Sequence, residues 1–551
     1  MSGLESGLFP RGNVQVTSGD AKQARSESFI TSNPKNPNNL IAASKKFSNP
    51  STYHFSIGVR VSFDAGKTWQ DATLPTLAEW GSFVGVGGKD AAAGMTDPAV
   101  AFDDFGNAFM AGEPISYGAN GQINTVGMYV YRSTDGGLSW NAPFPLHVGD
   151  SSDDKSWIGC DNDPSSPHYG NIYIVWGAGS PLRFARSTDH GATWKGVSTG
   201  PPGSQLTATT FAPEVTVGLD GTVHISWHFD SEDNGGPAGT TIEYMRSTDG
   251  GDSFEVQRSI VTGVQSLRGN LQEIDGWPVF PGGTFRVITV VTACAFRVGS
   301  FIGKHSRPNA HHYIVAWSDY REGVARVYYR ASADGGATFA GPGAGTPLLP
   351  PQSVTNTLHH FHPQIIATGA GVIGCAYYEY GPKNGSNRID VILSASFDEG
   401  ATFTETVIVT DRPWDPAIDA PFSHGDPKVT FIGEYFGLDS DKSSFDVLWT
   451  DTRTGVQELF FDRVATSRFV RIDHGATVEQ VLFGVVQDGG GAVFVNGHII
   501  IIPPRGPEFD MLQALAALSA AGNISGKAGR SLIKSTLSVI ATIAKEASKE
   551  V

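Results

Sequence analysis

The chain has few cysteines, few charged residues and no long apolar run. Its 551 residues include three cysteines, Cys160, Cys294 and Cys375, which cannot build a disulfide framework. Two of them lie inside apolar strand-like runs, so we interpret them as small buried hydrophobic side chains. No apolar run reaches membrane-spanning length, and no membrane partner is expected.

Basic side chains are also scarce, because 39 Lys and Arg face 55 Asp and Glu, a net charge of −16. This balance argues against a nucleic-acid partner and means that an anionic ligand would need a local cluster of arginines. The opening residues, MSGLESGLFPRGNVQVTSG, lack a basic start followed by an apolar segment, so no signal peptide is visible. If Met1 is native we expect a cytoplasmic protein, but a secreted protein whose signal has been removed would look the same.

What the chain has in abundance is glycine, at 67 residues, together with 32 Pro, 32 Phe and 11 Trp. Such a composition favours many short strands joined by tight turns. One eight-residue pattern, S-x-D-x-G-x-[ST]-[WF], recurs after strand-like runs. It starts at six serines: Ser62, Ser133, Ser187, Ser247, Ser332 and Ser396.

The physics of this motif is that of a hairpin turn. The Asp can accept hydrogen bonds from backbone N–H groups two residues on, and the Gly can adopt a positive φ without a Cβ penalty. The final Trp or Phe is expected to be buried between neighbouring sheets. The six Asp residues are therefore interpreted as structural: Asp64, Asp135, Asp189, Asp249, Asp334 and Asp398.

With the runs that precede each motif, the pattern predicts units of four antiparallel strands, the organisation of a β-propeller. A seventh unit, from IGEYFGLDS to VQELFFDRV, has three strands and no motif. Residues 13–18 are expected to supply its fourth strand, closing the ring and removing an exposed edge. Seven blades are favoured, and six is the alternative if two units share a sheet.

The composition changes after about residue 466, so we divide the chain into three parts. Residues 13–466 are predicted to form the propeller and 467–506 a small β extension. Residues 507–551 contain two helical patterns separated by Gly522 and Gly526, and are predicted to form a helical hairpin. This hairpin would pack on the propeller or mediate a homo-oligomer.

The six motifs resemble the Asp boxes (BNR repeats) of the sialidase-like propellers, and the resemblance covers about residues 14–465. Segments such as DDKSWIGCDNDPSSPHYGNIYIVW are similar to strands of bacterial sialidase-like proteins. Asp boxes also occur in xyloglucan hydrolases, lectins, photosystem assembly factors and sorting receptors. The resemblance therefore implies the fold and leaves the chemistry open.

In such a propeller the ligand face carries the loops that enter first strands and those that follow second strands. Two groups of polar residues are therefore candidates for the ligand face. Those at the entrances of first strands are Arg25, Glu27, Asp97, Asp154, Lys155, Glu214, Asp275, His362, Asp426, Glu434 and Tyr435. Those in the loops after second strands are Glu113, Asp230, Asp319, Arg321, Glu379, Asp451 and Arg453. Carboxylates that converge on one axis should raise each other's pKa values, as a general acid requires. The alternative for any single Asp is that its carboxylate only caps a turn before a proline.

The resemblance implies a Tyr nucleophile paired with Glu, an Asp acid/base and three arginines that grip a carboxylate. The catalytic candidates are Asp97, Asp154, Glu434 and Tyr435; the substrate-binding candidates are Arg25, Lys155, Arg321, Arg453, Asp319 and Asp451. Arg321 and Arg453 occupy matching W-x-D-x-R contexts. The F/Y-R-I-P motif is absent, and neighbours on a strand such as Glu434 and Tyr435 should point to opposite faces.

Two functions remain open at this point. One is hydrolysis or binding of an acidic glycan in the central funnel; the other is a non-catalytic binding or scaffold propeller. No cofactor is expected, and His359, His360, His362 and His424 lack zinc-site spacing. A structural calcium in the loop from Asp230 to Asp233 is left open.

Overall fold

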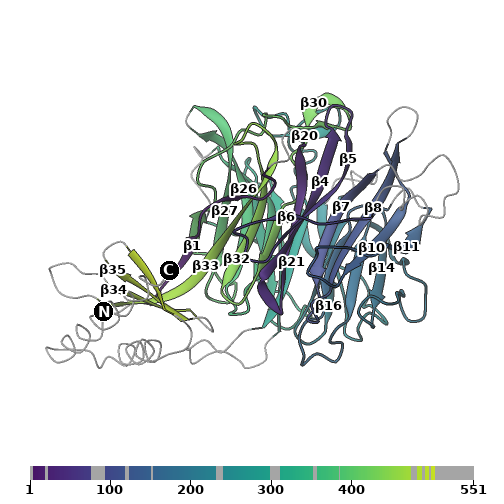
Figure 1. Ribbon diagram of the computed structural model, residues 1–551, viewed down its shortest axis with the longest axis horizontal. Helices are drawn as coiled ribbons and strands as arrows, with labels where there is room; N and C mark the ends of the chain where they lie inside the picture. Colours follow the sequence, from purple (N-terminus) through teal and green to yellow (C-terminus); the bar gives the residue numbers. More distant parts are fainter. Residues whose placement is uncertain are drawn as a thin grey trace.

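The computed structural model describes residues 4–18, 23–75, 94–117, 123–149, 153–230, 240–297, 311–350, 357–383, 385–472, 481–486, 490–495 and 498–502. All regular structure in these ranges is β-strand, and the named strands pair antiparallel (Figure 1). None of these residues forms a helix long and apolar enough to cross a membrane. The helical hairpin expected over 507–551 lies outside the described residues.

The strands form a β-propeller-like arrangement of sheets that stand side by side around an axis. The first sheet contains β3 (Arg25–Asn33), β4 (Asn36–Asn49), β5 (His54–Ser62) and β6 (Gln70–Asp71). The next contains β7 (Gly94–Phe102), β8 (Ala108–Tyr117), β9 (Ile123–Thr125), β10 (Gly127–Ser133) and β11 (Phe144–Val148).

Two consecutive units share the third sheet, because β14 pairs with β15. Its strands are β12 (Trp157–Cys160), β13 (Ile172–Trp176), β14 (Ala178–Ser187), β15 (Ser204–Val217), β16 (Val223–Asp230), β17 (Thr240–Ser247) and β18 (Arg258–Val264). Two four-stranded sheets follow: β21 (Val291–Arg297), β22 (His311–Asp319), β23 (Arg326–Ser332) and β24 (Thr346–Pro347), then β25 (His359–Ala367), β26 (Ile373–Lys383), β27 (Ser386–Ser396) and β28 (Glu405–Ile408).

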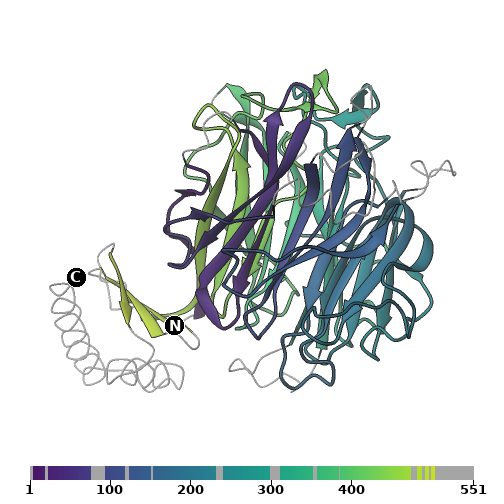
Figure 2. The same cartoon turned by 45° about the vertical axis from the view of Figure 1, so that its right-hand side comes forward.

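The last large sheet joins the two ends of the described chain. It contains β31 (Gly437–Ser440), β32 (Ser444–Asp451), β33 (Glu458–Ile472), β34 (Val481–Val486), β35 (Gly490–Val495) and β36 (His498–Ile502), with β1 (Leu4–Pro10) and β2 (Val14–Gln15) also paired to β33. Strands β34 and β35 stand away from the ring (Figure 2). Two short hairpins lie outside these sheets: β19 (Gln272–Ile274) with β20 (Trp277–Val279), and β29 (Phe422–Ser423) with β30 (Asp426–Thr430).

The strands nearest the axis contact one another in a closed circuit. Strand β3 contacts β7, and contacts continue through β12, β15, β21, β25 and β31 back to β3. Each of these strands is the first of its unit, so residues at their entrances converge on the axis. This convergence is what places the candidate site.

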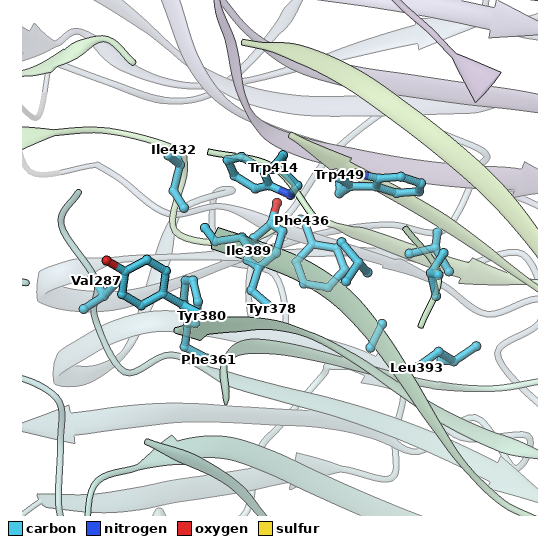
Figure 3. Close-up of a cluster of buried hydrophobic side chains, with 14 of the residues drawn as sticks. Val287, Phe361, Tyr378, Tyr380, Ile389, Leu393, Trp414, Ile432, Phe436 and Trp449 are labelled. Carbon is cyan, nitrogen blue, oxygen red and sulfur yellow. The ribbon is translucent and has the colours of Figure 1, made fainter. Parts of the chain in front are cut away.

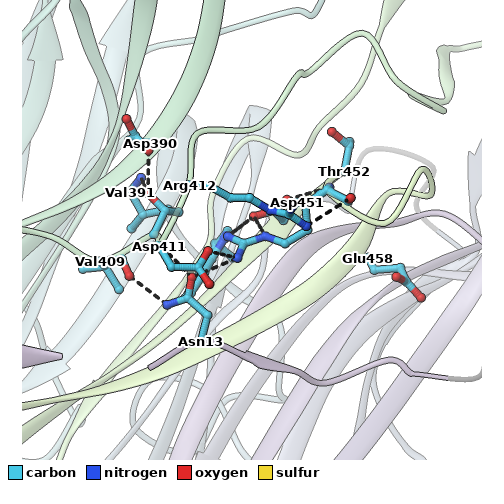
Figure 4. Close-up of polar contacts among 12 residues, drawn as sticks. Asn13, Asp390, Val391, Val409, Asp411, Arg412, Asp451, Thr452 and Glu458 are labelled. Carbon is cyan, nitrogen blue, oxygen red and sulfur yellow. Dashed lines mark hydrogen bonds and ion pairs between the residues drawn. The ribbon is translucent and has the colours of Figure 1, made fainter. Parts of the chain in front are cut away.

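Residues 13–18 close the ring as the sequence predicts. Val14 lies opposite Phe461 and Gln15 opposite Phe460, so β2 is the missing strand of the last unit. Asn13 secures the junction: its side-chain nitrogen donates to the Val409 carbonyl oxygen (2.8 Å), and its side-chain oxygen accepts from the Asp411 N–H (2.8 Å) (Figure 4). The closure is thus held by backbone pairing and by side-chain contacts.

The six eight-residue motifs form turns at the end of each unit's third strand, and the structure corrects their hydrogen bonding. In the first one, Asp64 accepts from the N–H of Thr68 (2.9 Å) and from its hydroxyl (2.6 Å), four residues on rather than two. The Ser62 hydroxyl accepts from the Gly66 N–H (2.9 Å) and donates to Asp64 (2.8 Å). The final aromatic ring is buried in three motifs (Trp140, Trp194, Phe403) and half-buried in the others (Trp69, Phe254, Phe339).

Packing between the sheets uses aromatic rings where two units meet. Tyr378 of β26 lies 4.7 Å from Phe436 and 6.0 Å from Trp414 between ring centroids (Figure 3). Each of these rings is at most 2% exposed, and burial of such a side chain contributes about 1.5 to 3 kcal/mol. Inter-sheet packing of this kind fixes neighbouring units relative to the axis.

Candidate active site in the central funnel

A cavity of about 640 Å³ opens where the chain enters its first strands, and we call it the funnel. Its wall combines charged side chains (Glu27, Lys45, Asp97, Asp154, Lys155, Arg286, Glu434) with aromatic ones (Tyr53, Phe55, Phe211, Trp277). None of the six motif turns, all of which are described, contributes to it. The funnel therefore lies apart from the motif turns, as expected from the sequence.

The backbone delivers three of these charged residues in an unusual conformation. Glu27 and Asp97 have φ values of 50° and 48°, and each sits at a β-bulge in the pairing of its first strand. Lys155, just before β12, has φ 56°. A non-glycine residue in the left-handed region costs about 1 to 2 kcal/mol, and a bulge re-aims its side chain. Local strain thus directs these side chains to the funnel.

Two buried lysines hold the carboxylates together. Lys45 Nζ lies 2.6 Å from Glu27 Oε2 and 3.5 Å from Asp97 Oδ1. Lys155 Nζ lies 3.3 Å from Glu27 Oε1 and 3.5 Å from Asp97 Oδ2, and it also pairs with Glu434. No side chain in this network is more than 10% exposed. Charges this deeply buried are tolerated because they are paired.

The environment separates the pKa values of neighbouring carboxyl groups. Burial opposes ionisation of Asp97, but Lys155 and Lys45 hold its pKa well below the usual value. Burial and the charge of Asp97 raise the pKa of Asp154 well above the usual value. The funnel therefore holds a carboxyl group that keeps its proton to higher pH beside one that ionises more readily, the combination that acid catalysis uses.

The pKa values of two buried glutamates, Glu27 and Glu434, are shifted in opposite directions. Burial and then Asp97 raise the pKa of Glu27 to about 7. Glu434 is also buried, but Arg286 and Lys155 outweigh burial and lower its pKa to about 2. Glu434 is therefore ionised throughout the physiological range.

Arg286 is fixed on the funnel wall by packing and hydrogen bonds. Its guanidinium carbon lies 4.3 Å from the Trp277 ring centroid and 4.2 Å from that of Phe431. Its Nε lies 3.1 Å from Glu434 Oε1, and its Nη1 donates to the Ser423 hydroxyl (3.1 Å). A guanidinium held in this way is organised in advance to receive an anionic group.

One oxygen each of Asp97, Glu113 and Asp154 lies within 4.8 Å of the others. A metal ion prefers such oxygen ligands, but two ammonium groups already contact Asp97. We therefore assign no metal or cofactor to the described part of the funnel.

The funnel brings together four of the ten catalytic and substrate-binding candidates, Asp97, Asp154, Lys155 and Glu434. It also includes Glu27, which the sequence places at the entrance of a first strand. Tyr435 is not among the residues that line it. The Tyr435 ring instead lies 6.4 Å from those of Phe29 and Trp157, and burial raises its pKa well above 10.0. Tyr435 therefore does not line the funnel with Glu434, although its ring lies 5.8 Å from Lys155 Nζ.

The predicted arginines and their aspartates are located elsewhere. Arg321 pairs with Asp319, donating from Nε to Oδ1 (2.8 Å), and Arg453 pairs with Asp451 in the same way (2.8 Å, to Oδ2). Arg25 is 1% exposed and its Nη1 donates to the Ser44 hydroxyl (3.4 Å). None of these five side chains lines the funnel. The paired arginines instead form ion pairs within their own blades, the alternative to glycan binding, and Arg453 also pairs with Asp411 after the preceding sheet.

Sequence reasoning missed Lys45, Arg286 and Trp277. Lys45 lies in the middle of strand β4, whereas the predicted residues lie in loops and at strand ends. Trp277 begins the short strand β20, and Arg286 lies between β20 and β21. The available signal was a basic residue inside an apolar run, LIAASKK for Lys45 and TFRVITVV for Arg286. A cation in such a run needs a buried anionic partner.

No family model matches the chain, and no curated protein matches it. Similar solved structures include a protein of unknown function from Dyadobacter fermentans DSM 18053 (13% identity, 83% of this chain and 99% of that chain, TM-score 0.42). Others are the Hadza microbial sialidase Hz136 (14%, 81% and 66%, 0.39) and an intramolecular trans-sialidase from Ruminococcus gnavus (12%, 67% and 93%, 0.35). At such identities and TM-scores, none of these similarities assigns an activity to this chain.

Proposed function

We propose that this protein hydrolyses an acidic glycan in the funnel, with Asp154 as the proton donor. The observation that carries the proposal is the pair of aspartates with opposite pKa shifts, Asp97 lowered and Asp154 raised, in a cavity of about 640 Å³. Pairs of carboxyl groups whose environments separate their pKa values are typical of glycoside hydrolases.

Each charged group has a role in this reaction. Asp154 transfers its proton to the glycosidic oxygen as the bond from that oxygen to the sugar carbon breaks. The ionised carboxylates of Asp97 and Glu434 stabilise the positive charge that develops on the sugar. A water molecule then supplies a hydroxyl to the sugar carbon and a proton to Asp154. The reaction uses no group from Tyr435, Arg25, Arg321 or Arg453.

The acidic character of the substrate rests on Arg286. Its guanidinium lines the funnel and is already oriented by Trp277, Phe431 and Glu434, so binding a carboxylate costs little side-chain entropy. Lys155, also on the funnel wall, adds a second positive charge. An anionic glycan is therefore favoured despite the acidic composition of the chain.

The propeller that holds this site has seven blades in our proposal, supported by the circuit of seven first strands. Pairing of β14 with β15 joins two neighbouring blades into one sheet, but β12 and β15 each keep a separate place in that circuit. The rival function is a non-catalytic binding or scaffold propeller. It is favoured by strands β34–β36, which extend the last sheet beyond the ring (Figures 1 and 2). A homo-oligomer through residues 507–551 would belong to that function.

The test is a screen of chromogenic glycosides, including uronides and sialosides, combined with glycan-binding measurements on the same protein. We expect hydrolysis by the parent protein and a loss of about 10²-fold or more in kcat for Asp154→Asn, because the acid is removed. Arg286→Met should mainly raise KM for acidic substrates. Asp439→Asn is the matched control, because Asp439 is a half-buried carboxyl group that also has a raised pKa but lines a different cavity.

The outcomes separate the two functions. Glycan binding without hydrolysis, unchanged in Asp154→Asn, would support the binding propeller. No binding and no hydrolysis across the screen would remove the carbohydrate assignment altogether.

A further inference from the structure

Glu113 lies beside the two aspartates without lining the funnel. It belongs to β8, opposite Thr96 of β7, and is 0% exposed. One of its oxygens lies within 4.8 Å of an oxygen of Asp97 and of Asp154. The charged or titratable groups that face it are these two aspartates, Lys155 and Tyr435.

The charges of this region do not balance if every carboxyl group is ionised. Five carboxyl groups (Glu27, Asp97, Glu113, Asp154, Glu434) accompany three cations (Lys45, Lys155, Arg286), an excess of two. The other charged residues on the funnel wall, Asp153 and Arg268, add one charge of each sign and leave this excess unchanged. An uncompensated buried charge is costly, so two groups must carry protons or bind a cation. Asp154 accounts for one of them in the proposed function.

Glu113 accounts for the other. Neither of its buried oxygens accepts a hydrogen bond of good geometry from the described residues. The hydroxyl of its neighbour Ser156 donates instead to the backbone oxygen of Asp97 (3.2 Å). Burial, followed by the charges of Asp97 and Asp154, raises the pKa of Glu113 well above 4.5. The Ser156 side chain acts in the opposite direction and lowers that pKa, but it does not outweigh burial. A neutral carboxyl group has a hydrogen of its own to donate.

We propose that Glu113 is a positioning residue: a neutral carboxylic acid whose O–H donates to the Asp97–Asp154 pair and stabilises Asp154 when that group has lost its proton. This role rests on the proposed function and adds a residue that never touches substrate. A buried acid kept neutral so that it can donate a hydrogen bond is an established device for stabilising negative charge.

Two variants of similar size separate this role from simple packing. Glu113→Gln keeps an N–H donor and cannot ionise, whereas Glu113→Met fills the space and donates nothing. The pKa of Asp154 is read by ¹³C NMR of carboxyl-labelled aspartate, assigned with Asp154→Asn. This measurement needs no substrate, so a failure of the positioning role can be told apart from a failure of the proposed function.

We expect Glu113→Met to raise the pKa of Asp154 by about one unit or more, because a hydrogen bond to the charged form is lost. Glu113→Gln should restore most of the parent value. With a cleaved substrate in hand, Glu113→Met should lower kcat about 10-fold to 100-fold with little change in KM, and Glu113→Gln should recover most of that loss.

Three results would overturn the assignment. The first is an identical effect of the two variants on the pKa of Asp154, which would reduce Glu113 to a space-filling role. The second is a Glu113 carboxyl resonance that is ionised at neutral pH. The third is a rise in the melting temperature of the parent with Ca²⁺ or Mg²⁺ alone that both variants lose, because the three carboxyl groups would then form a metal site.

Discussion

Arg453 and Arg321 occupy the same sequence context, W-x-D-x-R, and the structure gives them the same local geometry. In both, the Trp N–H donates to the Asp carboxylate (3.1 Å), and the Arg backbone N–H and Nε donate to that same carboxylate. Arg453 also reaches further: its Nη1 donates to Asn13 (3.1 Å) and pairs with Asp411, where the last sheet meets the N-terminal strand. Replacing each arginine by methionine should therefore expose the contribution of ring closure.

The difference between the two variants can be worked out from these contacts. Each variant leaves one fully buried aspartate, Asp319 or Asp451, without its cation, at a cost of about 3 to 5 kcal/mol. Arg453→Met also loses the Asn13 hydrogen bond, worth about 1 to 2 kcal/mol. The pair with Asp411, whose side chain is 61% exposed, adds at most about 1 kcal/mol. Arg453→Met should thus lower the free energy of unfolding by about 2 kcal/mol more than Arg321→Met.

The assay is equilibrium unfolding in urea, with limited proteolysis of residues 4–18 as the local readout. Only Arg453→Met should speed cleavage there, and both variants should bind glycans as the parent does. Equal destabilisation by the two substitutions would refute the closure role. Loss of glycan binding without loss of stability would restore the substrate-binding role predicted from the sequence.

Three further outcomes are expected. Deleting residues 1–18 should uncover the edge of β33 and promote association in light scattering, and a truncated protein that stays monomeric with an unchanged melting temperature would argue against this closure. Asp439 has a folded-state pKa of about 6, above its usual 3.8, so its contribution to stability falls as pH rises from about 4 to 6. The fall is about 1.4 kcal/mol per pH unit, and unfolding curves across this range should show that Asp439→Asn removes it. Asp135→Ala should cost about 2 to 4 kcal/mol in urea unfolding, because the Ser139 N–H and hydroxyl and the Ser133 hydroxyl lose one charged acceptor, while glycan hydrolysis should be unchanged.

The local features of this protein could be predicted from its sequence because their causes are local. The motif turns form from a serine, an aspartate and a glycine within eight residues, so a short window contains every partner. Closure by residues 13–18 was also predictable, because a three-stranded last unit leaves one position vacant. The same reasoning placed Asp97, Asp154, Lys155 and Glu434 at the entrances of first strands.

The tertiary structure decided which cations meet those carboxylates. Lys45 and Arg286 reach the funnel from the middle of a second strand and from a segment between sheets, and nothing in their spacing marks them as partners of Glu27 and Glu434. Conversely, Arg321 and Arg453 occupy the repeated W-x-D-x-R context that predicts substrate binding. Each guanidinium instead pairs with the aspartate two residues before it and does not line the funnel. The distances between these charges are set by the packing of the sheets around the axis. Part of the composition of the site could therefore be predicted from the sequence, whereas the pairing of its charges was decided by the fold.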